Sequence, residues 1–425
     1  MERPKNLWLS GILLMAMHYC TYAQVAASKT GISPDASAIL DVSGNDGGLL
    51  IPRMTESERD LISLPAHSLM IYQTDGTTGY YYNSGTAALP IWTPIAGENC
   101  SSKTLIDELP FTISTAGSYY LAANLMGSAG EHGIIVNSSN VVIDLNGYTI
   151  DGNSKSGNAG IILQTSSINV SIFNGNIVDW GQHGIGGANS DQGKLKYINA
   201  SNNSFDGISV GDNWVVEYCV ASNNGFDGID VSNSCNVSNC TSADNTSDGI
   251  ESSSGSNISH CTVENNNTGI NAIGANTVSH CNSYNNSNHG YNLGSGSNLQ
   301  NCTSIDNTGS GYYLNSAVHA NDNFARNNGS YGFRILSDSH ITSNTCDSNS
   351  SDAYYVQSTS NSLEGNLATD HSIGYNIQGS DNLVIKNKAS NCTTTHIASG
   401  GNLIATFLTS ADFSDNSIPH ANIEF

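Results

Sequence analysis

The chain has 425 residues, of which 12% are charged and 43 are glycine, and it carries a formal net charge of −23. A balance this acidic excludes nucleic acid and anionic membrane surfaces as partners, because both bind through basic patches. The shortage of charge is typical either of disorder or of many short strands joined by tight turns, and sequence periodicity decides between the two.

The first 23 residues have the pattern of a secretory signal peptide. A short positive start, "MERPK", precedes the apolar run "NLWLSGILLMAM", and Thr21 and Ala23 occupy the −3 and −1 positions of a cleavage site after Ala23. No later apolar run is long enough to span a membrane. We therefore expect a secreted or cell-surface protein that does not insert into the membrane after the signal is removed.

Residues 24–97 predict a small separate module. "TESE" at 55–58 predicts a capping box, Thr55 with Glu58, that opens a short helix through "RDLIS". "SLMIYQTDGTTGYYYNS" predicts two strands around a turn at Asp75–Gly76, and "PIWTPIA" predicts a closing strand. On "LLIPRMT" and "LMIYQTDG" the segment resembles modules at the head of secreted bacterial surface proteins and phage-fibre-like proteins, which implies attachment or presentation and no catalysis.

Residues 98–130 predict a cap segment, and from 131 to about 405 the chain repeats. A glycine followed by an apolar residue returns with a spacing that settles at 21, as in Gly207, Gly228 and Gly249. Each copy contains short alternating apolar runs separated by Asn, Ser and Gly, which predict strands and turns. A coil of about 21 residues that carries several strands and returns to its start predicts a parallel β-helix of about 12 coils, with 406–425 as a C-terminal cap or tail.

Two columns of identical residue types support this fold. The first is a predicted asparagine ladder four residues before each repeat glycine: Asn203, Asn224, Asn245, Asn265, Asn286, Asn307, Asn328 and Asn349, with Asp370 next. Asparagine tolerates left-handed turn geometry, and stacked amides can hydrogen-bond from coil to coil. The second column is Cys219, Cys240, Cys261, Cys281 and Cys302, which we interpret as inward-facing small apolar residues. Disulfides are the weaker interpretation, because side chains on stacked parallel strands lie too far apart.

The "NVVIDLNGYTIDG" stretch at 140–152 and the Gly-Ile repeats resemble right-handed parallel β-helix proteins. These share the fold of pectate lyases, polygalacturonases and a broad class of carbohydrate-binding and sugar-hydrolysis domains. The resemblance implies an all-β, right-handed solenoid. It leaves the activity open, because this fold hosts lyases, hydrolases, epimerases, adhesins and tailspikes.

An acidic cluster stands on four consecutive coils. Directly before the repeat glycine come His183, Asp206, Asp227 and Asp248, while Asp230 and Glu251 follow it by two residues and should point outward. Carboxylates this close either share a cation or raise each other's pKa. The candidate roles are therefore a calcium site of Asp206, Asp227, Asp248, Asp230 and Glu251, or the acid/base residues of a glycoside hydrolase with His183 assisting. The third interpretation is that Asp is a good turn former beside Gly and repeats because the coil repeats.

Comparison with the enzymes of this fold makes the catalytic interpretation weaker. Polygalacturonases carry an adjacent Asp-Asp pair, and no two Asp adjoin in this chain. Pectate lyases use Arg as the base, and no Arg falls between Arg59 and Arg326. A lyase acting on an acidic polysaccharide is therefore not expected.

Two further sets of side chains are candidates. Tyr313, Arg334 and Tyr355 occupy one outward column, as suits sugar rings or cation–π packing. His260 and His280, both in "SHC", are an outward pair that can hold a metal only with further ligands.

The sequence thus predicts a non-catalytic carbohydrate-binding or adhesin-like rod, with a polysaccharide or cell-surface glycan as partner. The alternatives are a polysaccharide-degrading enzyme, a hydrolase rather than a lyase, and a homotrimeric fibre like a tailspike.

Overall fold

The computed structural model describes residues 25–28, 37–43, 46–95, 103–164, 167–408 and 420–424. The chain divides into two compact units, residues 1–100 and residues 101–425. The predicted signal peptide lies outside the described residues. Among the helices that the structure describes, none is both long and apolar enough to cross a membrane.

The described part of the first unit contains a four-stranded sheet and one short helix. The sheet order is β3 (Arg53–Met54), β4 (Met70–Gln73), β5 (Gly79–Asn83) and β6 (Trp92–Pro94), and β1 (Val25–Ser28) pairs separately with β2 (Leu40–Ser43). The helix α2 (Glu56–Asp60) begins at the predicted capping box of Thr55 and Glu58. Strands β4 and β5 form the predicted antiparallel hairpin, with Gly76 at φ +57° in its turn.

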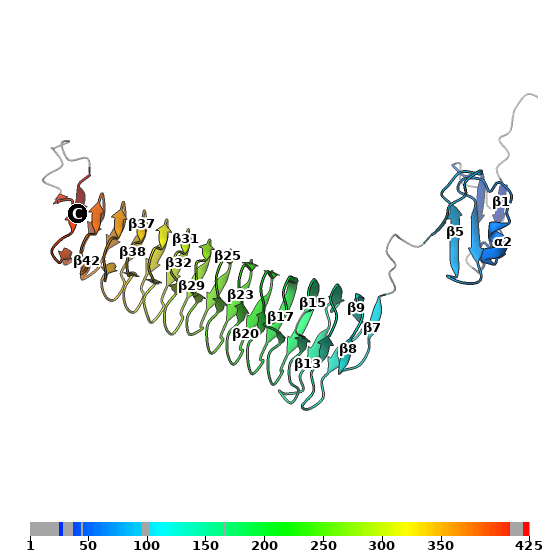
Figure 1. Ribbon diagram of the computed structural model, residues 1–425, viewed down its shortest axis with the longest axis horizontal. Coiled ribbons are helices and arrows are strands. Elements are labelled where there is room, and N and C mark those ends of the chain that lie inside the picture. Colours follow the sequence, from blue (N-terminus) through cyan, green and yellow to red (C-terminus); the bar gives the residue numbers. More distant parts are fainter. Residues whose placement is uncertain are drawn as a thin grey trace, which may run out of the picture. The chain divides into compact units, whose positions relative to one another are not determined.

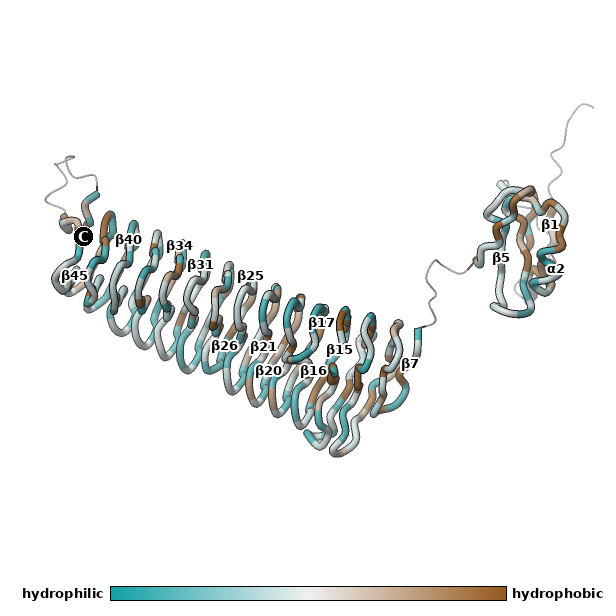
Figure 2. The backbone as a smooth tube through the Cα atoms, viewed as in Figure 1, coloured by the Kyte–Doolittle hydropathy of each residue, from teal (hydrophilic) through white to brown (hydrophobic). Residues whose placement is uncertain are grey.

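The second unit is a stack of parallel coils (Figure 1). Each coil contributes one strand to a 14-stranded sheet and further strands to a 28-stranded sheet, and every strand pair between neighbouring coils is parallel, as in Ile208↔Ile229↔Ile250. The predicted all-β parallel β-helix is confirmed, but the 14 strands of the smaller sheet show that it has more coils than the 12 predicted. Polar and apolar segments alternate along each coil, as a strand with one face inward and one face outward requires (Figure 2).

The 14-stranded sheet consists of β8 (Phe111–Ile113), β11 (Ile134–Val136), β14 (Ile161–Leu163), β16 (Ile185–Gly187), β18 (Ile208–Val210), β21 (Ile229–Val231), β24 (Ile250–Ser252), β27 (Ile270–Ala272), β30 (Tyr291–Leu293), β33 (Tyr312–Leu314), β36 (Phe333–Ile335), β39 (Tyr354–Val356), β42 (Ile373–Ile377) and β45 (Thr394–Ala398).

The 28-stranded sheet has two rows of strands that meet at a corner. The first row is β7 (Thr104–Ile106), β9 (Gly117–Leu121), β12 (Val141–Asp144), β19 (Val215–Glu217), β22 (Asn236–Ser238), β25 (Asn257–Ser259), β28 (Thr277–Ser279), β31 (Asn298–Gln300), β34 (His319–Asn321), β37 (His340–Thr342), β40 (Ser362–Glu364), β43 (Leu383–Ile385) and β46 (Leu403–Ile404). The second row is β10 (Leu125–Met126), β13 (Thr149–Asp151), β20 (Val220–Ser222), β23 (Thr241–Ala243), β26 (Thr262–Glu264), β29 (Asn282–Tyr284), β32 (Thr303–Ile305), β35 (Phe324–Arg326), β38 (Thr345–Asp347), β41 (Leu367–Thr369), β44 (Lys388–Ser390), β47 (Phe407–Leu408) and β48 (Asn422–Glu424). The long strands β15 (Val170–Val178) and β17 (Gly193–Ser201) run through both rows.

The ends of the stack extend past the repeats. Strands β7 to β10 already belong to the two sheets, so the first coil includes residues that the sequence placed in the cap segment. At the other end, β48 pairs with β44 and closes the last coil, so the predicted tail contributes at least one strand.

The interior is filled by apolar columns that run from coil to coil. The residue after each repeat glycine is fully buried, from Ile208 through to Tyr375. In the later coils this column becomes a stack of aromatic rings, Tyr291, Tyr312, Phe333, Tyr354 and Tyr375, with centroids 4.4–5.3 Å apart. Each tyrosine hydroxyl donates a hydrogen bond to a backbone carbonyl, as from Tyr312 to Cys302 O at 2.7 Å, and so remains satisfied inside the core.

The cysteine column is buried, as predicted, and the eight described cysteines are all free thiols. From the next coil onward asparagines take over its corner: Asn323, Asn344, Asn366 and Asn387 donate along the stack to the next amide oxygen at 2.9–3.4 Å. The sequence analysis missed this second ladder. A third row at the remaining corner includes Asn361 and Asn382.

The predicted asparagine ladder is present, with two corrections. Asn203, Asn224 and Asn245 donate in turn to the next amide oxygen at 2.9–3.0 Å, but the next member is Asn266, not Asn265. The coil between Gly249 and Gly269 has 20 residues in place of the usual 21. The missing residue falls between the ladder position and the repeat glycine, so Asn266 stands three residues before Gly269 and not four. The ladder ends on His371, not Asp370, with Asn349 Nδ2 3.1 Å from His371 Nε2. This coil keeps the usual length, but it has one residue more before the ladder position and one fewer between that position and Gly374.

This ladder explains the repeat glycine. A Cβ on Gly207 would stand 2.7 Å from the Nδ2 of Asn224 and 2.8 Å from the carbonyl oxygen of Gly228 on the next coil. A Cβ at Gly207 would therefore displace the ladder amide or push the coils apart. Alanine takes the equivalent position once, at the fully buried Ala353, so the stacked coils require a very small residue there.

Candidate functional site on the outward face of the 14-stranded sheet

The structure brings the predicted acidic cluster together. His183, Asp206, Asp227 and Asp248 stand in the turns directly before β16, β18, β21 and β24, so they stack on successive coils. His183 Nδ1 lies 3.0 Å from Asp206 Oδ2, and Asp206 is 8% exposed. The cluster is thus partly buried in the wall of the β-helix.

One oxygen of each aspartate has a structural partner on the following coil. Asp206 Oδ1 accepts a hydrogen bond from the Asp227 backbone N–H at 3.0 Å, and Asp227 Oδ1 accepts one from the Asp248 N–H at 2.7 Å. Asp248 Oδ1 accepts from the Thr268 N–H at 3.2 Å. These hydrogen bonds connect each turn to the turn on the next coil, so the Oδ1 atoms have the structural role that the turn-former interpretation predicts. The Oδ2 atoms remain for other partners.

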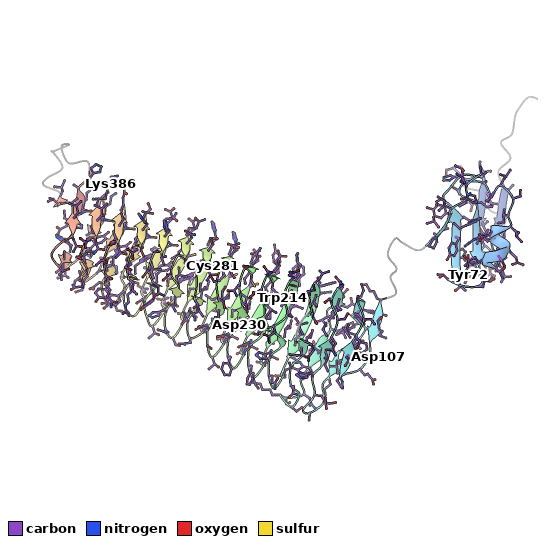
Figure 3. The ribbon with its side chains drawn as sticks, viewed as in Figure 1. Tyr72, Asp107, Trp214, Asp230, Cys281 and Lys386 are labelled. Carbon is purple, nitrogen blue, oxygen red and sulfur yellow. The ribbon has the colours of Figure 1, made fainter. Side chains whose placement is uncertain are left out.

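Asp230 and Glu251 lie on the outward face of β21 and β24, in register with each other; Asp230 is labelled in Figure 3. Asp230 Oδ2 accepts a hydrogen bond from the Ser209 hydroxyl at 3.0 Å. Among the described residues no side chain donates a hydrogen bond to Glu251. One carboxylate oxygen from each of Asp227, Asp248 and Glu251 lies within 4.8 Å of the other two.

Burial, followed by the neighbouring carboxylates, raises the pKa of three of the carboxyl groups. Burial, with the neighbouring Asp206 and Asp248 carboxylates, raises the pKa of Asp227 to about 6. Burial also raises the pKa of Glu251 to about 7, helped by the charges of Asp227, Asp230, Asp248 and Asp206. The pKa of Asp230 is raised by burial as well. Near neutral pH, Glu251 is therefore partly protonated beside ionised neighbours.

Such an arrangement can do two kinds of chemistry. Three carboxylate oxygens at these separations can serve as part of a calcium site, which a bound cation would relieve of its repulsion. A protonated carboxyl beside an ionised one can also serve as the acid and the base or nucleophile of glycoside hydrolysis.

Two aromatic side chains beside the acids were missed by the sequence analysis. Phe205 and Phe226 are 41% and 53% exposed, and each precedes an acid of the cluster. The Phe205 ring makes edge contacts with His183 and Phe226, at centroid distances of 5.3 and 5.4 Å. The signal was the repeated "FDG" at 205–207 and 226–228.

Tyr313, Arg334 and Tyr355 lie on β33, β36 and β39 in one outward row, as predicted. The Arg334 guanidinium lies 4.7 Å from the centroid of Tyr313, and its Nη2 donates to Gln357 Oε1 at 2.9 Å. His289 stacks on Tyr313, and Tyr331, which was missed, stacks on Tyr355 at 4.6 Å. Rings and guanidinium thus form one continuous surface.

The acidic cluster and the tyrosine–arginine row belong to the same face. Strand register connects Asp230, Glu251, Asn271, Asn292, Tyr313, Arg334 and Tyr355 on seven successive coils. We call this set the outward row. The amides join its two ends, because Asn271 donates to Asp248 Oδ2 at 2.7 Å and Asn292 donates to Asn271 Oδ1 at 2.9 Å.

His260 and His280 are exposed and stacked, with centroids 4.9 Å apart and planes 2° from parallel. Within the described part of the chain, Asp227, Asp248 and Glu251 are the only group of three metal-ligating side chains close enough to share an ion. The histidine pair therefore lacks the further ligands that a metal site requires.

Comparisons with known proteins agree with this architecture. Residues 132–286 match the model of the right-handed β-helix region, and residues 29–107 match the model of the phage tail-like trimerisation region. Comparison with curated protein sequences gave no match.

Three solved structures are similar to this chain at low identity. The A-module of the mannuronan C-5 epimerase AlgE4 from Azotobacter vinelandii is 15% identical, with 71% of this chain and 90% of that chain covered and a TM-score of 0.45. The tailspike protein gp49 of Acinetobacter baumannii bacteriophage Fri1, a capsular polysaccharide depolymerase, is 11% identical, covering 88% and 75%, with a TM-score of 0.33. The pectate lyase Pel9A is 12% identical, covering 68% and 72%, with a TM-score of 0.28. The chain is a right-handed parallel β-helix protein.

Proposed function

We propose that the chain is a secreted or cell-surface β-helix fibre that binds a polysaccharide along the outward row without cleaving it. The observation that carries this proposal is the continuity of the row over seven coils, from Asp230 to Tyr355. A row of this kind offers a repeating set of contacts at the spacing of about 4.8 Å between coils. An extended, repeating polymer fits such a surface better than a compact ligand does.

The chemistry of the row suits sugars. Aromatic faces pack against the apolar faces of pyranose rings, while amides and a guanidinium bind hydroxyl groups. The Tyr313–Arg334 stack and the Tyr331–Tyr355 stack hold these groups in fixed orientations before a ligand arrives. Preorganisation of this kind lowers the entropy cost of binding.

The test is a glycan-binding screen of the wild-type protein against Tyr313→Ala/Tyr355→Ala. Tyr284→Ala, a tyrosine on β29 of the other sheet, is the matched control. We expect the double variant to lose at least tenfold in affinity and the control to bind as wild type does. Equal binding by all three proteins would refute the proposed surface.

We also propose that the protein assembles as a homotrimer through residues 24–97. The match of residues 29–107 to a trimerisation region supports this assembly. Light scattering on the mature protein should give three times the chain mass, and removal of residues 24–97 should give a monomer. A monomeric mature protein would exclude the trimer.

A glycoside hydrolase is the second candidate, and the raised pKa values of Asp227 and Glu251 favour it. In this mechanism Glu251 is the acid, with Asp227 or Asp248 as its ionised partner; Asp206 and Asp230 support the charge and His183 orients Asp206. Cleavage of a bound glycan that Asp227→Ala and Glu251→Gln both abolish would replace the non-catalytic proposal. Intact glycan after prolonged incubation would support binding alone.

The same carboxylates would hold calcium if the cluster is a cation site. Calorimetric titration of calcium into wild type and into Asp227→Asn/Asp248→Asn separates this role from the others. Binding that the double variant loses would assign the ion to Asp227, Asp248 and Glu251. Absence of binding would leave the aspartates with their turn-capping role.

A further inference from the structure

Two exposed tyrosines stand at a corner of the 28-stranded sheet, away from the outward row. Tyr197 and Tyr218 are 55% and 47% exposed, and their ring centroids lie 5.3 Å apart. Both have left-handed backbone geometry, at φ 54° and 55°. The same corner is occupied by Asn174 on the preceding coil and Asn239 on the following coil, the residue type that this geometry favours. Backbone preference therefore does not explain the tyrosines.

Two lysines stand beside the tyrosines, in a long part of the chain that has no other positive side chain. Lys194 and Lys196 on β17 are the only Lys or Arg residues between Lys155 and Arg326. Lys196 Nζ lies 5.0 Å from the Tyr197 centroid and 5.2 Å from that of Tyr218. Glu217 Oε2 lies 3.0 Å from Lys194 Nζ and 3.7 Å from Lys196 Nζ, so one carboxylate faces two ammonium groups. The corner keeps a local positive charge on a strongly acidic protein.

Two hollows flank the tyrosine pair. One, of about 380 Å³, is lined by Val142, Phe173, Lys194, Lys196 and Tyr197, among others. The other, of about 290 Å³, is lined by Asn174, Asn176, Asn199, Tyr197 and Tyr218, among others. Tyr197 belongs to both, so the aromatic pair forms a ridge with an apolar, cationic hollow on one side and an amide-rich hollow on the other.

We propose that this tyrosine ridge is a second glycan-binding site, specific for sugars that carry a carboxylate. The exposed ring faces would stack on the apolar face of a pyranose, and Lys194 and Lys196 would bind its carboxylate. The asparagine amides of the second hollow would hydrogen-bond the hydroxyl groups of the adjoining residue. Tyr197 and Tyr218 hold a left-handed geometry that costs a bulky side chain free energy, where Asn174 and Asn239 stand on the flanking coils.

This site is independent of the outward row, because the two lie on different sheets and share no residue. Its ligand is also different in charge. The acidic end of the outward row would repel a polyanion, whereas the ridge attracts one.

The test is calorimetric binding of galacturonate, glucuronate and mannuronate tetrasaccharides, each compared with its methyl-esterified form. We expect at least one acid to bind, at least tenfold more tightly than its ester, and to weaken as salt is added. The ester keeps the rings and hydroxyls and removes the charge, so the ratio isolates the lysine contribution.

The variant Tyr197→Asn/Tyr218→Asn should fold, because Asn174 and Asn239 already occupy this corner on the flanking coils. This variant should lose at least tenfold in affinity for the acid, and Lys196→Met should bind the acid and the ester alike. His260→Asn/His280→Asn, an exposed stacked pair at the same corner on later coils, should bind as wild type does. Failure of every acid to bind at 1 mM, equal affinity for acid and ester, or unchanged affinity in the double tyrosine variant would overturn the proposal.

Discussion

Glu251→Gln tests the electrostatics of the acidic cluster directly. The Glu251 carboxyl lies beside Asp227 and Asp248 and has a pKa of about 7, against an ordinary value of 4.5. A carboxyl group that binds its proton more tightly in the folded state favours folding at low pH. That contribution is lost as the pH rises from about 4.5 to about 7.

The size of the effect follows from the shift. One pKa unit corresponds to about 1.4 kcal/mol, so the full shift amounts to about 3 kcal/mol. Solvent reaches part of this side chain and screens its charge, and we therefore expect about 2 kcal/mol. Glutamine has the shape of the protonated acid and never ionises. The variant should exceed the wild-type free energy of unfolding by less than about 1 kcal/mol at pH 5 and by about 2 kcal/mol at pH 8.

The assay is urea denaturation at pH 5, 6, 7 and 8, followed by tryptophan fluorescence. Trp180 and Trp214 are buried in the core of the β-helix and report on the coils near the cluster; Trp214 is labelled in Figure 3. Glu264→Gln, on β26 of the other sheet, is the matched control and should differ from wild type equally at all four pH values. A Glu251→Gln variant that is no more stable than wild type at pH 8 would show that the cluster does not strain the fold.

Three further predictions concern the core. Asn266→Ala should cost about 2 kcal/mol in urea denaturation, because it leaves the backbone N–H of Asn245 without its acceptor. Asn267→Ala, at an exposed position, should stay within about 0.5 kcal/mol. An equal loss of unfolding free energy in the two variants would contradict the assignment of Asn266 to the ladder. Tyr312→Phe should lower the free energy of unfolding by about 1 kcal/mol, measured by thermal denaturation, because the Cys302 carbonyl loses a donor; an unchanged midpoint would contradict this. Iodoacetamide should label the column from Cys219 to Cys302 only after unfolding in urea, as peptide mass spectrometry can show; labelling in the folded protein would refute its burial.

The repeat in the sequence was sufficient to predict the fold. A side chain at Gly207 would collide with the next coil, so glycine recurs at this position, with Ala353 in its place on one coil, and its spacing reveals the coil length. The column of Cys219 and its successors was predicted to face inward because alternation along a strand has only two directions. The choice of Asn266 over Asn265 as the ladder member was not predictable, because the residue missing from a shortened coil can fall on either side of the ladder position.

The site was predicted in pieces and not as one surface. Glu251 and Tyr313 both stand two residues after a repeat glycine, or its equivalent, and this shared offset could have joined the acids to the tyrosines. The raised pKa of Glu251 depends on burial that the sequence does not display. The ridge at Tyr197 and Tyr218 was missed because nothing in the sequence marks a left-handed tyrosine as different from an ordinary strand residue.

The asparagine ladder is a row of side-chain amide dipoles that point along the axis of the β-helix. From Asn203 to Asn328 each side-chain amide except that of Asn266 donates toward the later coil, so most of the side-chain dipoles align head to tail and polarise one another. Asn266 Nδ2 donates to the Ser242 carbonyl instead, and the Asn266 backbone N–H donates to Asn286 Oδ1. His371 terminates this series by accepting from the Asn349 N–H through Nε2, which only a neutral imidazole can do. Burial lowers the pKa of His371 and keeps it neutral. Unfolding of the β-helix in acid should therefore begin at the C-terminal coils, where protonation of His371 breaks the ladder. The acidic cluster, nearer the other end, should become more stable in acid.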